Sequence, residues 1–347
     1  MRAPRPILKL IGQLSMVVTP SLPASEAHES IHPGRWYDLP AVGTGPVQEH
    51  GVAATNDDLY IVGGISANVS TPVPPSRSDI SAYNFNTSSW RSVTPIPLGM
   101  THANAAAVDG KIYVLGGLTG NDYDPIWQYT ADCFMYDPDT DEWAHLPSMP
   151  DYQGRGASAI GVYKSTVYLA GGMRSNYLVP GGLQDSVDIV TAYDTHTGEW
   201  TTLPSLPGRR DHVGGAVIGS TFFVVGGRDH GHDNKKNTTW AMDLNAPEDG
   251  WTAKAEMPTA RAGMATGVIG RFIVTFGGEG NREDPSGVFA QAEAYDTQDD
   301  RWTELSEMLV PRHGMAAASV RDSVFIAGGG LVEGGDEPID IFTSFTL

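Results

Sequence analysis

Short runs of apolar residues recur along the chain, and each run ends at a pair of glycines. The six runs are LYIVGG, KIYVLGG, TVYLAGG, TFFVVGG, FIVTFGG and VFIAGGG, with first glycines at Gly63, Gly116, Gly171, Gly226, Gly277 and Gly328. Because polar residues do not alternate with the apolar ones, these runs predict strands that are buried on both faces. The even spacing of the first glycines shows that the chain repeats a unit of about 50 residues.

A second pattern follows most of the apolar runs after a loop of variable length. It consists of a strand that ends in Tyr, a polar turn and a Trp, as in FMYDPDTDEW and AYDTHTGEW. The Tyr-to-Trp spacing is the same in four units, at Tyr83/Trp90, Tyr136/Trp143, Tyr193/Trp200 and Tyr295/Trp302. The fourth unit differs, with Met242 in the Tyr position and two extra residues before Trp251. Asp, Thr and Pro in the turn favour a tight β-hairpin, so each unit is expected to form a sheet of four strands.

The two ends of the repeat region are predicted to meet. Five of the six glycine-ended runs are followed by a Trp, and the last run is not. A sixth Trp, Trp36 in GRWYDLP, lies instead near the N-terminus and precedes Trp90 by about one period of the repeat. The N-terminal segment is therefore expected to supply the outer strand of the last sheet, beside DIFTSFTL. Such closure removes two open sheet edges. The predicted fold class is all-β, a six-bladed β-propeller of four-stranded blades that is closed by the N-terminal strand.

These units resemble the kelch repeat family, in the galactose-oxidase and kelch-like superfamily. The resemblance rests on the glycine pair, the Tyr–Trp spacing and the period, and it covers about Trp36 to Leu347. It implies a six-bladed β-propeller but no single function, since kelch propellers include ubiquitin-ligase adaptors, actin binders, plant specifier proteins and copper radical oxidases. The last group needs a Cys cross-linked to a Tyr, whereas Cys133 in ADCFMYDP occupies a strand-like context typical of a small buried hydrophobe. No cofactor is therefore predicted.

Composition and the N-terminus narrow the possible partners. The formal charge is −19 without any long basic run, which argues against nucleic acid and anionic membrane surfaces as partners. Residues 1–27 have the basic start, short apolar stretch and small residues of a secretory signal peptide, which leaves residues 28–347 as a single propeller domain. Sequons at Asn68, Asn86 and Asn237 are compatible with a secreted glycoprotein. A cytoplasmic or organellar location is the alternative.

Four arginines share one position in the repeat. Arg155 precedes the first glycine of its pair, Gly171, by a number of residues that also separates an arginine from the first glycine in each of the last three units. In the first and second units, the same position is occupied by Val47 and Met100. The arginines at this position are Arg155, Arg210, Arg261 and Arg312. If the blades are radial, these guanidinium groups converge at one mouth of the funnel and bind an acidic small molecule or an acidic protein segment. The alternative is that each arginine pairs with an Asp or Glu of a neighbouring blade and is structural.

Histidines gather near the same position. His102 and His212 lie two places after the arginine position of their units, His50 lies three places after it, and His313 lies one place after it. Adjacent strand positions point to opposite faces, so all four are not expected to converge. His102, His212 and His313 are the candidate catalytic residues for proton transfer, and a structural role is the alternative.

The loops after the glycine pairs supply further candidates. Asp229, His230, His232 and Asp233 have metal-ligand side chains, although His-x-His in a loop is a weak indication and a polar surface loop is the alternative. Trp127, Tyr123 and Tyr177 lie outside the repeat pattern and are candidates to cover a pocket.

Two functions remain in competition. The first is a secreted propeller that binds an acidic small molecule or protein partner at the arginine-lined mouth. The second is a pocket enzyme without redox chemistry, such as a cyclase, isomerase or lyase of a specialised-metabolite pathway. Whether the protein is an enzyme is left open.

Overall fold

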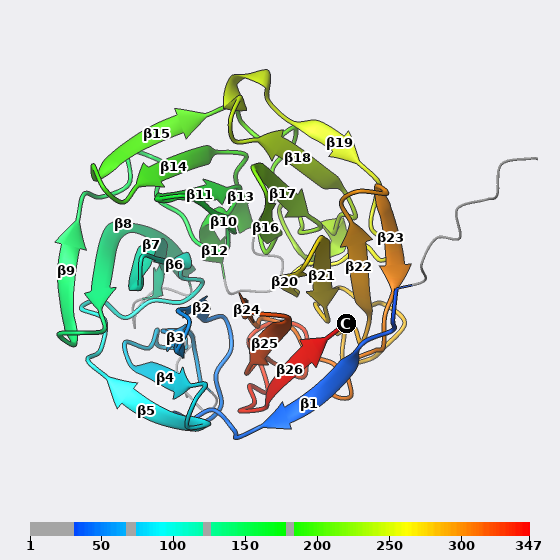
Figure 1. Cartoon of the computed structure of the whole chain (residues 1–347), viewed down its shortest axis with the longest axis horizontal. Coiled ribbons are helices and arrows are strands. Elements are labelled where there is room, and N and C mark those ends of the chain that lie inside the picture. The colour runs from blue at the N-terminus through cyan, green and yellow to red at the C-terminus, as the bar shows by residue number, and fades with distance from the viewer. Residues whose placement is uncertain (1–30, 67–73, 121–125, 178–183) are drawn as a thin grey trace, which may run out of the picture. The chain divides into compact units, whose positions relative to one another are not determined.

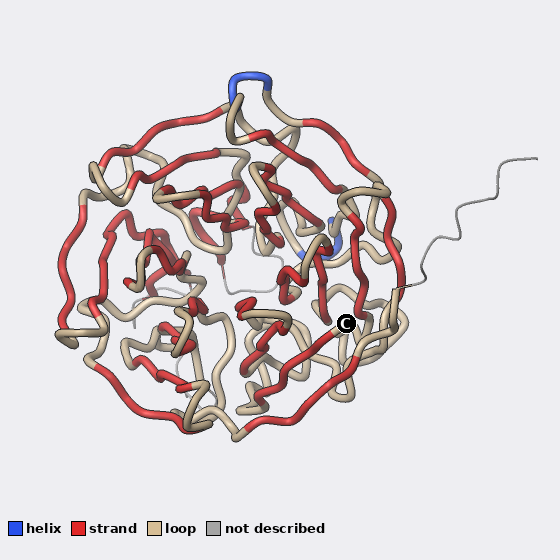
Figure 2. Tube along the Cα trace, in the orientation of Figure 1, coloured by secondary structure: helices blue, strands red, loops and turns tan. Residues whose placement is uncertain are grey.

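The computed structural model describes residues 31–66, 74–120, 126–177 and 184–347. The predicted signal peptide (1–27), Tyr123 and the sequon at Asn68 lie outside these residues. Residues His32–Leu347 form one compact unit, and its described residues form strands, connecting loops and the 3-10 segments η1 (His232–Asn234) and η2 (Pro247–Asp249) (Figure 2). No helix in the described ranges has the length and apolar character needed to cross a membrane.

Six antiparallel sheets are arranged around one axis, as the sequence predicts (Figure 1). The first three blades have the strand orders β2-β3-β4-β5, β6-β7-β8-β9 and β10-β11-β14-β15. Their strands are β2 (Gly51–Ala54), β3 (Asp58–Val62), β4 (Ile80–Asn84), β5 (Ser89–Val93), β6 (Ala105–Val108), β7 (Lys111–Gly120), β8 (Ile126–Asp137), β9 (Glu142–Leu146), β10 (Ala159–Tyr163), β11 (Thr166–Ala170), β14 (Val190–Asp194) and β15 (Glu199–Leu203). In the second blade, the long strand β8 also pairs with β12 (Met173–Tyr177), which in turn pairs with β13 (Gln184–Ser186).

The last three blades have the strand orders β16-β17-β18-β19, β20-β21-β22-β23 and β24-β25-β26-β1. Their strands are β16 (Gly214–Ile218), β17 (Thr221–Val225), β18 (Thr239–Asp243), β19 (Thr252–Lys254), β20 (Ala265–Ile269), β21 (Phe272–Phe276), β22 (Ala292–Asp296), β23 (Arg301–Glu304), β24 (Ala317–Val320), β25 (Ser323–Ala327), β26 (Phe342–Thr346) and β1 (Arg35–Leu39). Strand β1 pairs with β26 from Arg35↔Thr346 to Leu39↔Phe342, so the predicted closure of the ring by the N-terminal strand is confirmed.

The Tyr–Trp spacing sets the register of the outer hairpin in each regular blade. Tyr83 lies directly opposite Trp90 across β4 and β5, and their ring centroids are 5.1 Å apart. The indole nitrogen of each repeat Trp then donates to a backbone carbonyl at the end of the preceding blade. The six bonds, of 2.9–3.1 Å, join Trp36 to Ser306, Trp90 to Pro40, Trp143 to Thr94, Trp200 to Pro147, Trp251 to Pro204 and Trp302 to Ala255. This outer belt of hydrogen bonds links every blade to its neighbour.

The glycine pairs end the second strands because the next blade approaches closely there. Gly277 has φ +59°, and a Cβ atom on it would overlap the carbonyl oxygen of Arg312 in the following blade. That carbonyl accepts a 2.9 Å hydrogen bond from the amide of Gly278. Glycine is favoured where both a left-handed conformation and a close backbone approach are required.

Candidate functional site on the propeller axis

A ring of six residues surrounds the axis immediately before the inner strands. Each lies two places after the arginine position of its unit, and each has a left-handed φ between 49° and 61°. The ring consists of Glu49, His102, Ala157, His212, Gly263 and Gly314. The amide of each donates to the carbonyl of the ring residue in the preceding blade, over 2.7–3.1 Å, so six backbone hydrogen bonds form a closed circle. This circle fixes where the six side-chain positions lie.

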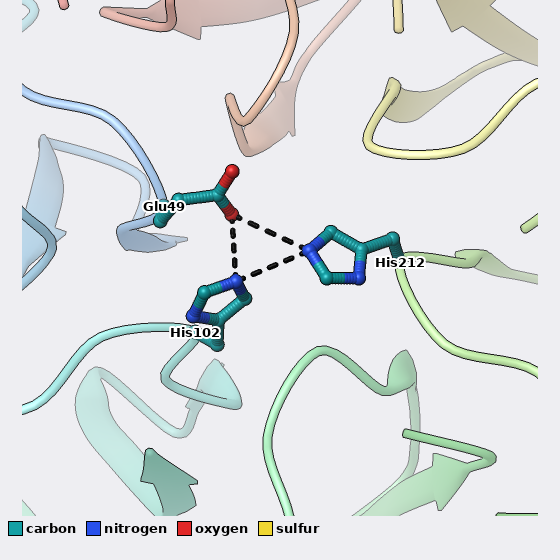
Figure 3. Close-up of side chains that lie close together, drawn as sticks. All are labelled: Glu49, His102 and His212. Carbon is teal, nitrogen blue, oxygen red and sulfur yellow. Dashed lines mark hydrogen bonds and ion pairs between the residues drawn. The ribbon is translucent and has the colours of Figure 1, made fainter. Parts of the chain in front are cut away.

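Three of the ring positions carry side chains that converge (Figure 3). Nε2 of His102 lies 3.0 Å from Oε2 of Glu49 and 3.1 Å from Nε2 of His212. The third side of the triangle, from His212 Nε2 to Glu49 Oε2, is 3.7 Å. A left-handed conformation costs a residue with a side chain about 1 kcal/mol or more, a cost that glycine avoids at the equivalent positions.

The far nitrogen of each imidazole has its own acceptor. The hydroxyl of Thr101 donates to the carbonyl of Glu49 over 2.9 Å, so its oxygen accepts from Nδ1 of His102 at 3.1 Å. Nδ1 of His212 donates to the carboxylate of Asp211 over 2.6 Å. With both Nδ1 atoms protonated, the Nε2 lone pairs point towards each other and towards the Glu49 carboxylate.

Four further charged or titratable residues complete what we call the axial cluster: Asp211, Arg228, Glu279 and His313, beside Glu49, His102 and His212. Arg228 donates to Asp211 over 3.1 Å and forms a close ion pair with Glu279. Its Nη2 lies 3.1 Å from both ring nitrogens of His212. His313 donates from Nε2 to the carbonyl of Val332, and its Nδ1 lies 3.3 Å from Glu279. Every member is at most 9% exposed.

The surroundings keep the carboxylates of the cluster ionised. Burial alone would raise the pKa of Glu49, but its interactions with His102, His212 and His313 outweigh burial and lower the pKa. Burial likewise opposes ionisation of Asp211 and Glu279, and the pKa of each is lowered by its neighbours, chiefly His212 and Arg228 for Asp211 and Arg228 and His313 for Glu279. Burial and the charge of Arg228 lower the pKa of His212, which favours its neutral imidazole.

A channel of about 450 Å³ runs along the inner strands from this cluster. Glu49, His102 and His212 line one end of it, and small residues such as Ala105, Gly161 and Gly267 line its length. At the other end it adjoins a second hollow of about 700 Å³, because Ala54, Ala107 and Ser319 line both. A volume of this size accommodates a small organic molecule.

The second hollow carries an excess of negative charge. Five carboxylates line it, against two cationic side chains: Asp57, Asp58, Asp109, Asp137, Asp139, Lys111 and Arg321. A surplus of two negative charges remains even when Arg91, which pairs with Asp58, is counted. The hollow therefore favours the approach of cations and uncharged molecules over anions.

The four arginines at the shared repeat position lie inside their own blades. Arg155 is fully buried and donates to the carbonyls of Gly171 and Leu169, and burial lowers its pKa to about 9. Arg261 is likewise fully buried and forms a 2.6 Å ion pair with Glu293, which lies in its own blade and not in a neighbouring blade as the structural alternative expected.

Arg312 donates to the hydroxyl of Thr343 over 2.9 Å, and Arg210 lies 4.4 Å from the ring centroid of Trp240. None of the four guanidinium groups lines the axial channel or meets another in the described residues. The geometry gives them partners within their own blades and provides no shared opening for an acidic ligand.

The histidines divide as their offsets suggest. His102 and His212, at the same offset, point to one spot, and His313 approaches Glu49 only to 3.9 Å. His50 points elsewhere, and burial lowers its pKa to about 4. The four imidazoles do not all converge, which agrees with strand alternation.

The loop residues with metal-ligand side chains face different partners. His230 pairs with Asp229 and with Arg209, Asp233 pairs with Arg282, and His232 faces Arg228 and Glu279. The structure therefore does not bring the side chains of this predicted metal site together at one point. The predicted residues are Asp229, His230, His232 and Asp233.

The predicted aromatic cover is only partly seen. Trp127 is buried, with its ring centroid 5.4 Å from that of His102, whereas Tyr177 is half-exposed on β12. Cys133 is buried, and burial raises the pKa of its thiol to about 12.

Glu49 is the residue of the candidate site that sequence reasoning missed. The offset from the glycine pair that singles out His102 and His212 selects Glu49 in the first unit. Reading one column of the repeat through all six units, whatever the residue type, would have identified it. A search restricted to histidines did not.

Comparison with known proteins identifies the family to which the chain belongs. A family model described as the KLHDC2/KLHL20/DRC7 Kelch-repeats domain matches residues 29–205 and 157–330. The chain belongs to the kelch repeat family.

Individual relatives have related names and longer chains. "Kelch-like protein terF" of Aspergillus terreus is 38% identical over 307 residues, which cover 87% of this chain and 66% of that protein. "Kelch-like protein 34" of Homo sapiens is 24% identical over 72% of this chain and 38% of its own length, and "Alpha-scruin" of Limulus polyphemus is 26% identical over 69% and 26%. The chain thus spans less than two thirds of the length of these relatives.

Among solved structures, one titled "Structure of YjhT" has a TM-score of 0.70 at 18% identity, over 87% of this chain and 95% of that one. This similarity shows the fold alone.

Proposed function

We propose that the protein binds a small, uncharged or cationic organic molecule in the axial channel and acts on it without redox chemistry. The reaction classes that suit the site are those of an isomerase, lyase or cyclase, in which an oxygen-bearing group is polarised or a proton is moved. Glu49, His102 and His212 are the side chains proposed to contact the molecule. This is the pocket-enzyme alternative of the sequence analysis, with Glu49 added.

One observation carries the proposal. Three potential proton donors or acceptors converge within 3.7 Å at the end of a channel that is otherwise lined mainly by small residues. Burying such groups is costly, and they are held at a left-handed backbone position that costs further free energy. Strained, buried and mutually oriented titratable groups in a cavity are typical of a site where a ligand is bound or converted.

The charges favour a ligand that is not an anion. The far hollow has a surplus of negative charge, and Glu49 is ionised at the inner end. Kelch propellers commonly bind proteins, and the secreted binder of an acidic partner remains a prediction from the sequence. The placement of the arginines provides no support for it at the channel.

The test is to identify what the channel retains. The purified protein is mixed with a metabolite extract of the producing organism, re-isolated by gel filtration, denatured and analysed by mass spectrometry. We expect wild-type protein to enrich a small set of compounds, and Glu49→Gln and His102→Ala to lose that enrichment at least tenfold. Products of incubation are expected to share the formula of the substrate or to differ by an eliminated neutral molecule such as water.

His145→Ala serves as the control, because His145 is exposed on β9 and does not line the channel. Equal enrichment by Glu49→Gln, His102→Ala and wild type would place binding elsewhere and refute the proposal. So would the absence of any compound enriched over a denatured sample.

A further inference from the structure

The geometry points to a divalent transition-metal ion held by Oε2 of Glu49, Nε2 of His102 and Nε2 of His212 at the end of the axial channel. The inference rests on the proposed function and deepens it, since it names what these three side chains hold at the same site. It concerns residues other than the metal candidates of the 229–233 loop.

The first argument is the lone-pair geometry. Three acceptor atoms face one another at 3.0, 3.1 and 3.7 Å, and the Nδ1 atoms of both histidines are committed as donors to Thr101 and Asp211. Lone pairs at this separation repel unless a proton or a cation lies among them. One proton can bridge only two of the three atoms, whereas a metal ion bridges all three.

The second argument is that the triangle has the size a metal requires. Ligand atoms bonded at about 2.0–2.1 Å to a tetrahedral ion lie about 3.3 Å apart, and those of an octahedral ion lie about 3.0 Å apart. The observed sides of 3.0, 3.1 and 3.7 Å span these values. Two imidazoles and one carboxylate form a ligand set used for zinc and for other divalent first-row metals, and it leaves positions for a water or substrate.

The third argument is the support behind the ligands. Metal-binding histidines usually donate their other ring nitrogen to an oxygen acceptor, which fixes the tautomer and the ring orientation. Asp211 and Thr101 provide these acceptors, and Asp211 is in turn held by Ser186 and Arg228. Both rings are therefore oriented before any ion arrives.

The fourth argument is charge. The axial cluster contains three carboxylates (Glu49, Asp211 and Glu279) and one guanidinium group (Arg228), so its acidic side chains outnumber its guanidinium group. All of these groups are buried, and an uncompensated buried negative charge is unfavourable. A divalent cation compensates it, and the acidic hollow at the far end of the channel concentrates cations there.

The experiment uses the full chain, stripped with a chelator and dialysed against metal-free buffer. Zn²⁺ is titrated by calorimetry, with competition from a chromogenic chelator to measure the affinity, and Co²⁺ provides a spectroscopic probe of the coordination. We expect one ion per chain, with an affinity weakened at least a hundredfold in the double variant His102→Ala/His212→Ala and at least tenfold in Glu49→Gln. Nitrogen ligation is expected to give Co²⁺ visible absorption bands that the double variant lacks.

His50→Ala is the matched control, since His50 is also a buried histidine next to the ring but supplies no ligand atom. It is expected to retain the affinity of wild type, and circular dichroism of every variant verifies the fold. The inference is overturned if wild type binds neither Zn²⁺ nor Co²⁺ with a dissociation constant below about 100 µM. It is also overturned if the double variant binds these ions as tightly as wild type.

The two proposals fail separately. If wild type binds no metal while Glu49→Gln still abolishes metabolite enrichment, the metal inference is wrong and the proposed function stands. If the metal binds at the triangle but no metabolite is enriched, the proposed function fails alone.

Discussion

At the scale of single residues, equivalent positions of the repeat carry different residue types in different blades. The repeat position of the axial ring is Gly in two blades, which suits a left-handed backbone, but it is Ala in one blade and Glu or His in three. The neighbouring arginine position is structural in its contacts, because each guanidinium group lies among partners of its own blade. The residues of the candidate site and the arginines that pack inside the blades therefore lie at nearby positions of the same short segment.

Arg261 allows these roles to be separated. Arg261→Ala leaves the Glu293 carboxylate buried without its 2.6 Å partner, so we expect a loss of about 3–5 kcal/mol in the free energy of unfolding, measured by urea denaturation. Adding Glu293→Gln removes the unpaired charge and is expected to recover part of that loss. Unchanged stability together with lost binding of an acidic metabolite would instead restore the ligand role predicted from the sequence.

At the scale of the elements, each blade is a four-stranded sheet whose second strand is buried and ends at the neighbouring blade. The glycine pair combines two constraints, a positive φ and contact with the next backbone, and the chain offers a pair of positions that separates them. Gly277 has φ +59° and is crowded by Arg312, whereas Gly270 has φ +57° in a hairpin turn with nothing near its Cβ position.

We expect Gly270→Ala to lower the free energy of unfolding by about 1 kcal/mol, the cost of a left-handed alanine. Gly277→Ala carries the same conformational cost and also forces two blades apart, so it is expected to cost at least about 2 kcal/mol more. Chemical denaturation of both variants measures the difference. Equal losses would show that backbone conformation alone accounts for the glycine pair.

At the scale of the whole molecule, two concentric sets of hydrogen bonds close the ring. The inner circle joins the six axial residues through their backbones, and the outer belt joins each Trp to the preceding blade. Both sets cross the junction between the last blade and the first, where Glu49 bonds to Gly314 and Trp90 bonds to Pro40. The two halves of the site, His212 on one side and Glu49 with His102 on the other, depend on this closure for their geometry.

Removing β1 should therefore affect more than one blade. A chain that begins at Pro40 lacks the partner of β26 and the bond from Trp36 to Ser306, so it exposes an unpaired strand edge. We expect a lower unfolding temperature, self-association in analytical ultracentrifugation and weakened Zn²⁺ binding. A chain that begins at Ile31 and keeps β1 is the matched control, and identical behaviour of the two truncations would contradict the expectation.

The repeat could be predicted from the sequence because each of its features depends on residues that are close together in the chain. Apolar runs, glycine pairs, turn residues and a Tyr–Trp spacing each act within a short stretch of chain, and their period of about 50 residues predicts six blades and the strand that closes them. The candidate histidines His102 and His212 came from the same counting.

What tertiary structure alone decided is which of the equally spaced side chains meet. Glu49, His102 and His212 belong to three different blades, and only the radius of the ring and the left-handed backbone at each position bring their polar atoms within 3.7 Å. The arginines two positions earlier recur with the same period, but their side chains point into their own blades because of the direction of the chain at that position. Periodicity along a chain gives equivalent places in a ring, but the direction of each side chain depends on backbone angles and packing that the period does not contain.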